Sequence, residues 1–477
     1  MENTNVNVTN NVAAEEVKHM LQLFIGAEDL QDCLSQIRDV KAKAVVFTPG
    51  ELTTATSEKG KTMTLCNYQI SKVLDGGAVG IKTNATIRYN VYGLADKAVA
   101  IKAEPMKDMV VAFAADQLEA LAGVVSKTDT LAFVVNTTDR TCTVKVVSSN
   151  GGAFRAEMSL PIVDKYIPFE VKGKELASAT VLESDISVIS KALSSICVDI
   201  PKEWMNSVSL GFGGEKLKVL ITNSVMFMPI VVENSTVVPC ESKDLYLLKK
   251  DDFSVAAGLV KAGGKVKISL RGKDTGEVTG FAFEVENGPV ATFSKYNING
   301  GVCTASTFDM FRGLGAEQDN RFVFDKEDIE KAFHLQEIGN AGVYMASFEF
   351  DNETDIKLVS YGGTTDKAST VKGKVQLSEE AKARKYIFRT NHFLGVLSNL
   401  VLHKIEDENG KEIGKERVTV YITDKAFCFA NVRKGTVLGI GIASTSDADN
   451  LLKLQNTKKE PKAKAADKKD ENAKQDK

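Results

Sequence analysis

A long apolar segment is missing from this sequence. Nowhere in the chain of 477 residues is there a run of the roughly 18 to 20 apolar residues that a membrane-spanning helix needs. The first residues, MENTNVNVTNNVAAEEV, also lack the basic start and apolar core of a secretory signal. We therefore expect a cytoplasmic protein without a membrane partner. Hydrophobic residues make up 43% of the chain and charged residues 26%, which predicts about two to four globular domains at this length.

Closely spaced cysteines are missing as well. The seven cysteines occur singly and form no CxxC pair; they lie at positions 33, 66, 142, 197, 240, 303 and 428. Such spacing indicates neither a zinc site nor a disulfide framework. A single buried cysteine packs as a small hydrophobic side chain, so we predict no metal and no cofactor.

Catalytic signatures do not occur either. The four histidines lie in or beside expected helices without a serine or cysteine nucleophile signature, and no HExxH is present. The glycine-rich pieces GFGG and GIGIAS lack the spacing of a phosphate-binding loop. We therefore predict no catalytic residues and a protein that is not an enzyme.

An excess of positive charge is the last absence. The formal net charge is -3. A protein that grips nucleic acid by electrostatic attraction usually has a strongly basic domain, because its affinity comes from cations that displace counterions at phosphates. A role on DNA would therefore need a local basic surface or a topological mode of holding.

What the sequence does contain is one unit repeated six times, a short strand followed directly by an amphipathic helix. The six copies are MLQLFIGAEDLQDCLSQIRDV (20–40), MVVAFAADQLEALAGVVS (109–126), ASATVLESDISVISKALSSICV (177–198), DLYLLKKDDFSVAAGLVKAGG (244–264), RFVFDKEDIEKAFHLQEIG (321–339) and KYIFRTNHFLGVLSNLVLHK (385–404). In each helix apolar residues recur at spacings of three and four. In the last copy these residues are Phe393, Val396, Leu397 and Leu400. One face of every helix is therefore predicted to be buried.

The flanking residues support these boundaries. Ser184, Asp251, Asp325 and Thr390 lie where helix N-caps are expected. After each helix come two or three strands rich in β-branched residues, separated by turn signals such as GG, DTG and ENG. The pattern predicts an α+β fold.

Pairing the six units gives three domains of similar build. Their predicted bounds are residues 18–170, 171–305 and 306–445. The units are too large for a solenoid repeat and have too few strands for a propeller blade. Residues 1–17 are rich in asparagine and residues 446–477 in charge, so both ends are predicted to be disordered.

This order of units resembles the bacterial-type DNA polymerase sliding clamp, the β-clamp or DNA polymerase III subunit beta family, over residues 20–443. AFRAEMSLPIVDKYIPF (153–169) is similar to the end of the first clamp domain. KLKVLITNSVMFMPIVV (216–232) and FRTNHFLGVLSNL with VTVYITDKAFCFANV (within 388–432) are similar to later clamp strands and the last helix. The resemblance implies three tandem DNA-clamp domains, each of two strand-helix-strands units. It also implies a homodimeric ring, with helices lining the hole and antiparallel sheets outside.

Such a ring encircles duplex DNA and tethers a polymerase. Because the closed ring itself keeps the DNA in place, strong attraction to phosphates is not needed and a near-neutral chain is compatible with this function. The predicted DNA-binding residues are the basic residues on and beside the helices, with one tryptophan that could stack on a base. They are Arg38, Lys41, Lys43, Lys127, Lys191, Trp204, Lys250, Lys261, Lys265, Lys331 and Lys404. Each cation could instead be an ordinary solvated charge, and Trp204 a core residue.

The resemblance also implies a cleft between the second and third domains, where polymerases and the clamp loader insert a short apolar motif. It falls on Thr222, Met226, Phe227, Val437, Leu438, Ile440 and Ile442. Met226 and Phe227 could equally be core residues. Clamps usually show Thr-Asp-Gly-His-Arg-Leu and end at Met-Pro-Met-Arg-Leu, whereas this chain has TNSVMF and VLGIGIA and then continues. These departures indicate a divergent clamp, for example one encoded by a bacteriophage.

Two functions follow as hypotheses. The first is a DNA polymerase processivity factor whose partners are duplex DNA, DNA polymerase, a clamp loader and a second copy of the chain. The alternative is a non-enzymatic, β-rich structural assembly protein, such as a component of a phage shell or tube. A helix at the same place in all six units favours the clamp, because a β-rich assembly has no need of one.

Overall fold

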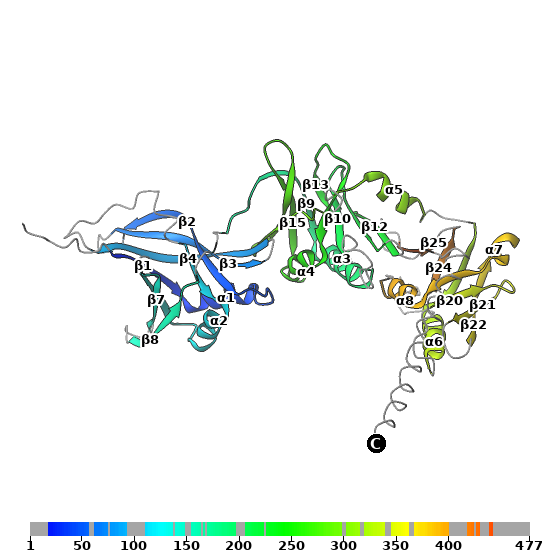
Figure 1. Ribbon diagram of the computed structural model, residues 1–477, viewed down its shortest axis with the longest axis horizontal. Helices are drawn as coiled ribbons and strands as arrows, with labels where there is room; N and C mark the ends of the chain where they lie inside the picture. The colour runs from blue at the N-terminus through cyan, green and yellow to red at the C-terminus, as the bar shows by residue number, and fades with distance from the viewer. Residues whose placement is uncertain are drawn as a thin grey trace, which may run out of the picture. The chain divides into compact units, whose positions relative to one another are not determined.

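The computed structural model divides the chain into two compact units. Unit 1 comprises Met1–Glu175 and Gly258–Ser294, and unit 2 comprises Leu176–Ala257 and Lys295–Lys477. Figure 1 labels the helices and strands along the chain. The structure describes residues 18–56, 62–74, 77–92, 110–136, 139–147, 154–163, 166, 169–196, 206–223, 226–297, 302–314, 319–338, 345–361, 367–399, 417–423, 426–429 and 438–441. The two ends predicted to be disordered, residues 1–17 and 446–477, lie outside these ranges.

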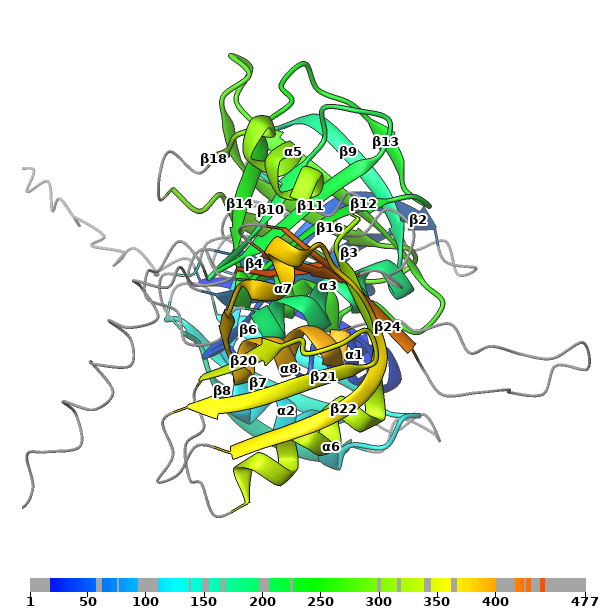
Figure 2. The ribbon, with the colours of Figure 1, turned by 90° about the vertical axis from the view of Figure 1, so that its right-hand side faces the viewer.

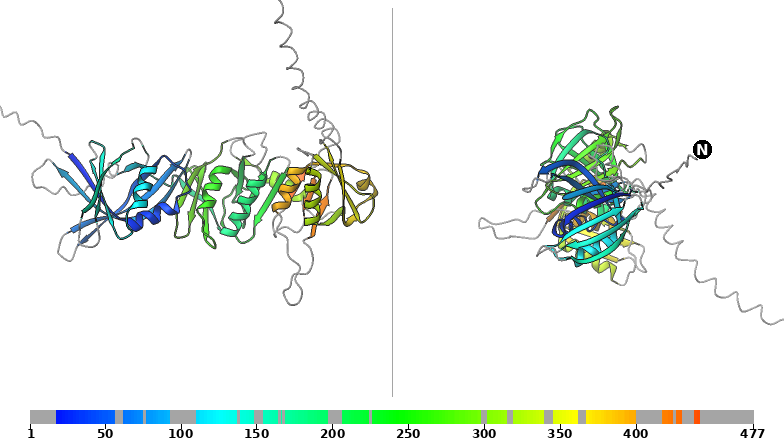
Figure 3. Two further views of the ribbon diagram at one scale, coloured as in Figure 1. Left: turned by 90° about the horizontal axis from the view of Figure 1, so that it is seen from below. Right: turned by 90° about the vertical axis from the view of Figure 1, so that its left-hand side faces the viewer.

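Unit 1 is a strongly bent antiparallel sheet with helices on one face. Its elements are β1 (Lys18–Gly26), α1 (Ala27–Gln36), β2 (Ala44–Thr56), β3 (Thr62–Leu74), β4 (Gly77–Tyr92), β5 (Val111–Ala114), α2 (Ala115–Val124), β6 (Thr130–Asn136), β7 (Thr141–Val147), β8 (Phe154–Pro161), β15 (Lys265–Gly272), β16 (Val278–Val285) and β17 (Val290–Ser294). The strand order is β15-β16-β17-β4-β1-β6-β7-β8, and β2 pairs with β3 and β5. Seen from below, α1 and α2 (blue and cyan) lie together on one face of the sheet (Figure 3, left).

The predicted apolar faces hold this unit together. Leu30 and Leu34 of α1 and Leu118 and Leu121 of α2 are buried. The two helices are also joined by Gln31, whose Nε2 donates to the Ala122 carbonyl at 2.7 Å and the Val125 carbonyl at 3.0 Å. Burial of this apolar surface is the main source of stability.

Unit 2 is built from helices and strands of the same kinds, and most of its strands form a second antiparallel sheet. Its elements are β9 (Lys174–Leu182), α3 (Glu183–Ile196), β10 (Ser207–Gly211), β11 (Leu217–Thr222), β12 (Met226–Val232), β13 (Thr236–Val238), β14 (Leu245–Lys249), α4 (Lys250–Gly258), β18 (Val302–Cys303), α5 (Ala305–Leu314), β19 (Arg321–Asp325), α6 (Lys326–Glu337), β20 (Met345–Glu349), β21 (Asp355–Tyr361), β22 (Lys367–Gln376), α7 (Glu379–Ala383), β23 (Tyr386–Arg389), α8 (Thr390–Asn399), β24 (Arg417–Ile422), β25 (Ala426–Phe429) and β26 (Leu438–Gly441). The sheet order is β18-β14-β10-β11-β12-β26-β25-β24-β19-β22-β21-β20-β23. Figure 2 shows β20, β21 and β22 side by side, with α6 and α8 along one face.

Aromatic rings fill the core beneath α6 and α8. Phe393 of α8 lies 5.2 Å from Phe348, 5.0 Å from Phe388 and 5.5 Å from Phe333, measured between ring centroids. The predicted face of this helix is thereby confirmed for Phe393, Val396 and Leu397, which are all buried. Leu400 lies outside the described residues.

The six predicted strand-helix units and the α+β antiparallel architecture are confirmed. Two features differ from the prediction. Helices α5 and α7 were not predicted. Helix starts also differ. Of the four expected N-caps, Asp325 is the N-cap of α6 but makes no side-chain cap bond, and the other three lie in the first turns. The Asp325 carboxylate instead lies 3.4 Å from Arg417.

Candidate functional site

The residues predicted to form the cleft that the structure describes lie in unit 2, where β12 pairs with β26. We call this pairing the β12–β26 seam: Met226 is registered with Ile440, and Phe227 with Gly439. Strand β25 flanks β26 on its other side, with Phe427 opposite Ile440. Leu438 and Ile440 are thus placed in the seam by backbone pairing. Val437 and Ile442 lie outside the described residues.

A buried asparagine fixes the turn that leads into β12. Met226 donates its N–H to the Asn223 side-chain oxygen at 2.7 Å. The Asn223 amide in turn donates to the carbonyl of Ile196, the last residue of α3, at 2.8 Å. Thr222 donates its hydroxyl to the Met226 carbonyl at 2.9 Å. The turn is therefore held to the end of α3 by hydrogen bonds that the buried groups need.

Met226 and Phe227 themselves are core residues, with exposed fractions of 0% and 3%. Phe227 packs with Ala426 and Cys428 of β25, and the half-buried Phe311, Leu314 and Tyr421 pack against this cluster. The rings of Phe227 and Phe311 are 4.8 Å apart. Burial raises the pKa of the Cys428 thiol to about 12. The surface that a ligand can reach here is consequently made by Phe311, Leu314 and Tyr421.

Helix α5 supplies part of this surface, and the sequence pattern did not predict it. Phe308 anchors the helix, because it is fully buried against Leu220 and Leu245. Phe311 and Leu314 follow at intervals of three residues, which places them on neighbouring positions of the helix surface. This apolar spacing was the available signal, but α5 falls outside the six repeated units.

The predicted DNA-binding cations in unit 1 lie mainly after helices rather than on them. Arg38, Lys41 and Lys43 follow α1, and Lys127 follows α2. Lys261 and Lys265 precede and begin β15. All six side chains are exposed. Lys127 pairs with Glu28 at 3.5 Å, whereas the other five cations have no ion-pair partner among the described residues. Cations just after a helix also interact favourably with its C-terminal carbonyls.

Three more predicted cations lie in unit 2. Lys191 is exposed on α3, Lys250 is half-buried at the start of α4, and Lys331 is exposed on α6. Lys331 forms an ion pair with Glu327, one helical turn earlier, at 2.7 Å. Trp204 and Lys404 lie outside the described residues.

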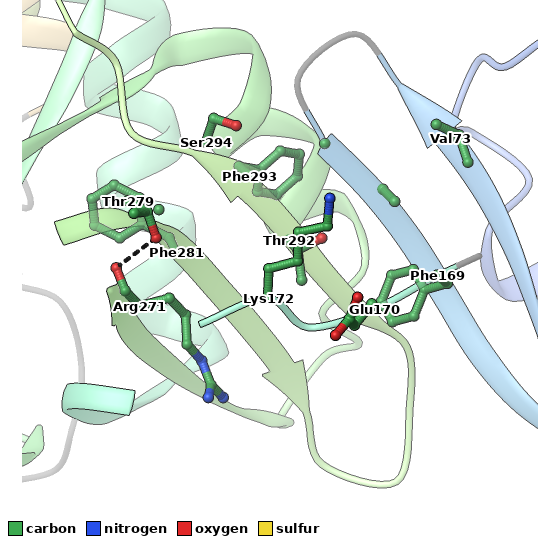
Figure 4. A pocket seen from close by; sticks show the side chains of 13 residues that line it. Val73, Phe169, Glu170, Lys172, Arg271, Thr279, Phe281, Thr292, Phe293 and Ser294 are labelled. Atoms are coloured by element: carbon green, nitrogen blue, oxygen red, sulfur yellow. Dashed lines mark hydrogen bonds between the residues drawn. The ribbon is translucent and has the colours of Figure 1, made fainter. Parts of the chain in front are cut away.

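Unit 1 has a cavity of about 370 Å³ beside the pairing of β4 with β17. Figure 4 shows the rings of Phe169, Phe281 and Phe293 around it, and the Thr279 hydroxyl donating to the Arg271 carbonyl. Arg271 also lines it, but its guanidinium is paired with Glu284 at 3.0 Å and with Glu175 at 3.6 Å. The cavity therefore has apolar walls, a compensated charge at Arg271 and two further charged lining residues, Glu170 and Lys172.

Two absences apply to the described parts of the chain. No three His, Cys, Asp or Glu side chains in these ranges come together to hold a metal ion. No described helix is both long and apolar enough to cross a lipid bilayer.

No protein-family model matches the sequence, and no curated protein does so either. Solved structures do match. DNA polymerase III subunit beta from Pseudomonas aeruginosa aligns with a TM-score of 0.62 and 13% identity, over 89% of this chain and 99% of that chain. The sliding clamp from Bartonella birtlesii bound to griselimycin aligns with a TM-score of 0.59 and 12% identity, over 89% and 100%. The chain has the sliding-clamp fold.

A third sliding-clamp subunit, from Borrelia burgdorferi in complex with a natural product, aligns over 89% of this chain and 98% of its own, with a TM-score of 0.58 and 10% identity. The predicted clamp architecture is thus confirmed as a fold, in a sequence that has diverged far from these clamps. What a fold does depends on the sites it carries.

Proposed function

We propose that this protein is a sliding clamp, a non-catalytic processivity factor that encircles duplex DNA and tethers DNA polymerase. The observation that carries the proposal is the alignment of 89% of the chain with nearly the whole length of solved clamps. The proposal keeps the division into three tandem domains, each of two strand-helix-strands units. Its partners are duplex DNA, a DNA polymerase, a clamp loader and a second copy of the chain.

Holding DNA by enclosure fits the charge of this chain. The net charge of -3 is too small to grip phosphates strongly, and strong phosphate contacts would oppose sliding. In the proposal, the exposed cations after α1 and α2, together with Lys191, make weak contacts with the backbone of enclosed DNA. Trp204 and Lys404 are kept as proposed DNA-binding residues.

A ring requires a second subunit, and two features favour one. Strand β8 is an edge strand of its sheet, and edge strands readily pair with another chain. Leu335 of α6 and Ile338, the C-cap residue of this helix, are 62% and 68% exposed, which is unusual for two large apolar side chains so close together. In the proposal, these surfaces join two copies into a closed homodimer.

The β12–β26 seam is the proposed polymerase site. Its apolar cluster with Phe311, Leu314 and Tyr421 accepts the partner's apolar motif. We expect Leu438→Ala combined with Ile440→Ala to weaken binding of such a motif and to leave the dimer intact, as measured by peptide titration and solution mass. Unchanged affinity for the motif would remove the seam as the site.

Retention on DNA tests the clamp itself. After loading, the protein should stay on circular DNA and run off linear DNA of the same sequence, because only a free end releases an enclosing ring. Equal loss from both DNAs would refute the proposal. Its solution mass should be about twice 51.7 kDa, whereas an open-ended series of larger species would favour the structural assembly protein.

A matched pair of variants sharpens this experiment. Leu335→Ser with Ile338→Ser should give monomers and abolish the retention on circular DNA. Val124→Ser removes another exposed apolar side chain, 82% exposed on α2, and should keep both the dimer and the retention.

A further inference from the structure

The exposed flank of α5 is apolar and has no covering element among the described residues. Moving around the helix from the buried Phe308, the next apolar side chains are Phe311 and Leu314, both half-buried. Met310 comes next and is 56% exposed. Met310 and Leu314 are four residues apart and therefore lie on the same side of the helix. The flank thus continues from the core to the solvent beside Phe227.

The chain itself continues from this place. Strand β26 ends at Gly441, which is registered with Ala426, and Ala426 belongs to the same cluster as Phe227. Residues 442–450, IASTSDADN, follow, and then Leu451, Leu452 and Leu454. After Leu454 the sequence contains no further Leu, Ile, Val, Phe or Met. These leucines are therefore an apolar island in a polar, charged segment.

Reach favours contact between this island and α5. The nine residues 442–450 can span up to about 30 Å, which is ample for a flank that begins next to the end of β26. The match is apolar with apolar, because the leucines and the flank formed by Phe311, Leu314 and Met310 are of the same character.

We propose that Leu451, Leu452 and Leu454 occupy the apolar flank of α5 in the same chain and compete there with the partner's motif. This inference rests on the proposed function, since it regulates the proposed polymerase site. A short linker holds a tethered segment at an effective concentration on the order of 1 mM. A segment with a Kd of about 100 μM would then weaken an external ligand about tenfold. The tail would thus raise about tenfold the concentration of partner that is needed to occupy the site.

Peptide binding to the full-length chain tests this competition. The probe is a fluorescent peptide of residues 446–458, SDADNLLKLQNTK. It is titrated against the unchanged chain and against a chain carrying Leu451→Ser, Leu452→Ser and Leu454→Ser together. We expect the peptide to bind the triple variant about tenfold more tightly, because the tethered competitor is gone. Equal affinity for the two chains, or no binding to the triple variant, would overturn the proposal.

Two substitutions in the triple variant locate the site. Met310→Ser changes an exposed side chain of the flank and should weaken the peptide at least about tenfold, the scale of one buried apolar side chain. Val124→Ser, at an exposed apolar residue of α2, should leave the affinity unchanged. A peptide affinity that is unchanged by Met310→Ser would overturn the assignment of the site to α5. Retention on circular DNA is measured separately, so failure of the clamp proposal and failure of the tail proposal give different results.

Discussion

Two strand pairings in this protein join strands that are distant in the sequence, and they do so with different side chains. In unit 1, the β4–β17 seam registers Gly77 to Gly80 with Val290 to Phe293. In unit 2, the β12–β26 seam registers Met226 and Phe227 with Gly439 and Ile440. Because these strands are far apart in the sequence, each seam depends on long-range contacts between side chains and backbone.

The first seam brings backbones together through glycine. A Cβ atom at Gly77 would lie 2.5 Å from the Thr292 carbonyl oxygen and 2.6 Å from the Phe293 ring, closer than real Cβ contacts. The second seam instead presents a large ring, Phe227, to helix α5. The second seam thus adds a ring contact with α5, and in the proposed function this contact forms part of the surface that accepts the partner's motif.

The largest expected effects come from the buried phenylalanine in each seam. Phe227 and Phe293 are both 3% exposed, so truncation to alanine should lower the free energy of unfolding by about 3 to 5 kcal/mol in either case. Urea unfolding measures this. Only Phe227→Ala should also weaken binding of the 446–458 peptide, measured with the triple variant (Leu451→Ser, Leu452→Ser and Leu454→Ser). Equal weakening by Phe293→Ala would remove the functional difference between the seams.

Glycine substitution tests the close approach in the first seam. Gly77→Ala should lower the free energy of unfolding by about 1 to 3 kcal/mol, because the added methyl group overpacks the seam. A Cβ atom added at Gly123 in α2 would meet no other atom within 4 Å, so Gly123→Ala should raise stability by about 0.5 to 1 kcal/mol through helix propensity. Effects of the same sign in urea unfolding would contradict the assigned role of Gly77.

The sequence predicted the repeated units better than the seams. The helix faces were recoverable because the spacing of residues such as Leu30 and Leu34 depends only on the helical period. The burial of Met226 could not be predicted in this way. An apolar strand residue can face either a core or a groove, and which of the two it faces depends on the elements that pack against the strand. Helix α5 was missed because it lies between repeats. The seams depend on pairing between distant strands, for which a single sequence contains no direct signal.

The reactivity of the Cys428 thiol measures how well α5 excludes water from the β12–β26 seam. Burial raises the pKa of both Cys142 and Cys428 to about 12 from 9.0. Only the thiolate reacts, and at pH 8 a pKa of about 12 leaves about one thiol in 10,000 ionised. Phe311→Ala should admit water to the cluster, lower the pKa of Cys428 and speed its alkylation about tenfold.

Cys142 in β7 is the internal control for that experiment. Its alkylation rate, followed by mass spectrometry of digested protein, should be the same in the parent chain and in Phe311→Ala. A faster reaction at both cysteines would mean that the substitution loosens the whole fold, and an unchanged rate at Cys428 would mean that α5 does not seal the seam.

DNA binding should be the property in which the two regions are alike. Lys261, next to β15 in unit 1, and Lys191, on α3 in unit 2, are both exposed. If each contacts one phosphate, substitution by alanine should reduce the salt slope of binding by about one. Between 50 and 200 mM salt, that change amounts to about a fourfold difference in affinity. Lys273→Ala is the control, because this exposed lysine is already paired with Glu277 at 2.6 Å. Fluorescence anisotropy with a short linear duplex would measure the salt slope of each variant. If only Lys261→Ala or only Lys191→Ala changed the slope, only one of the two regions would contact the DNA.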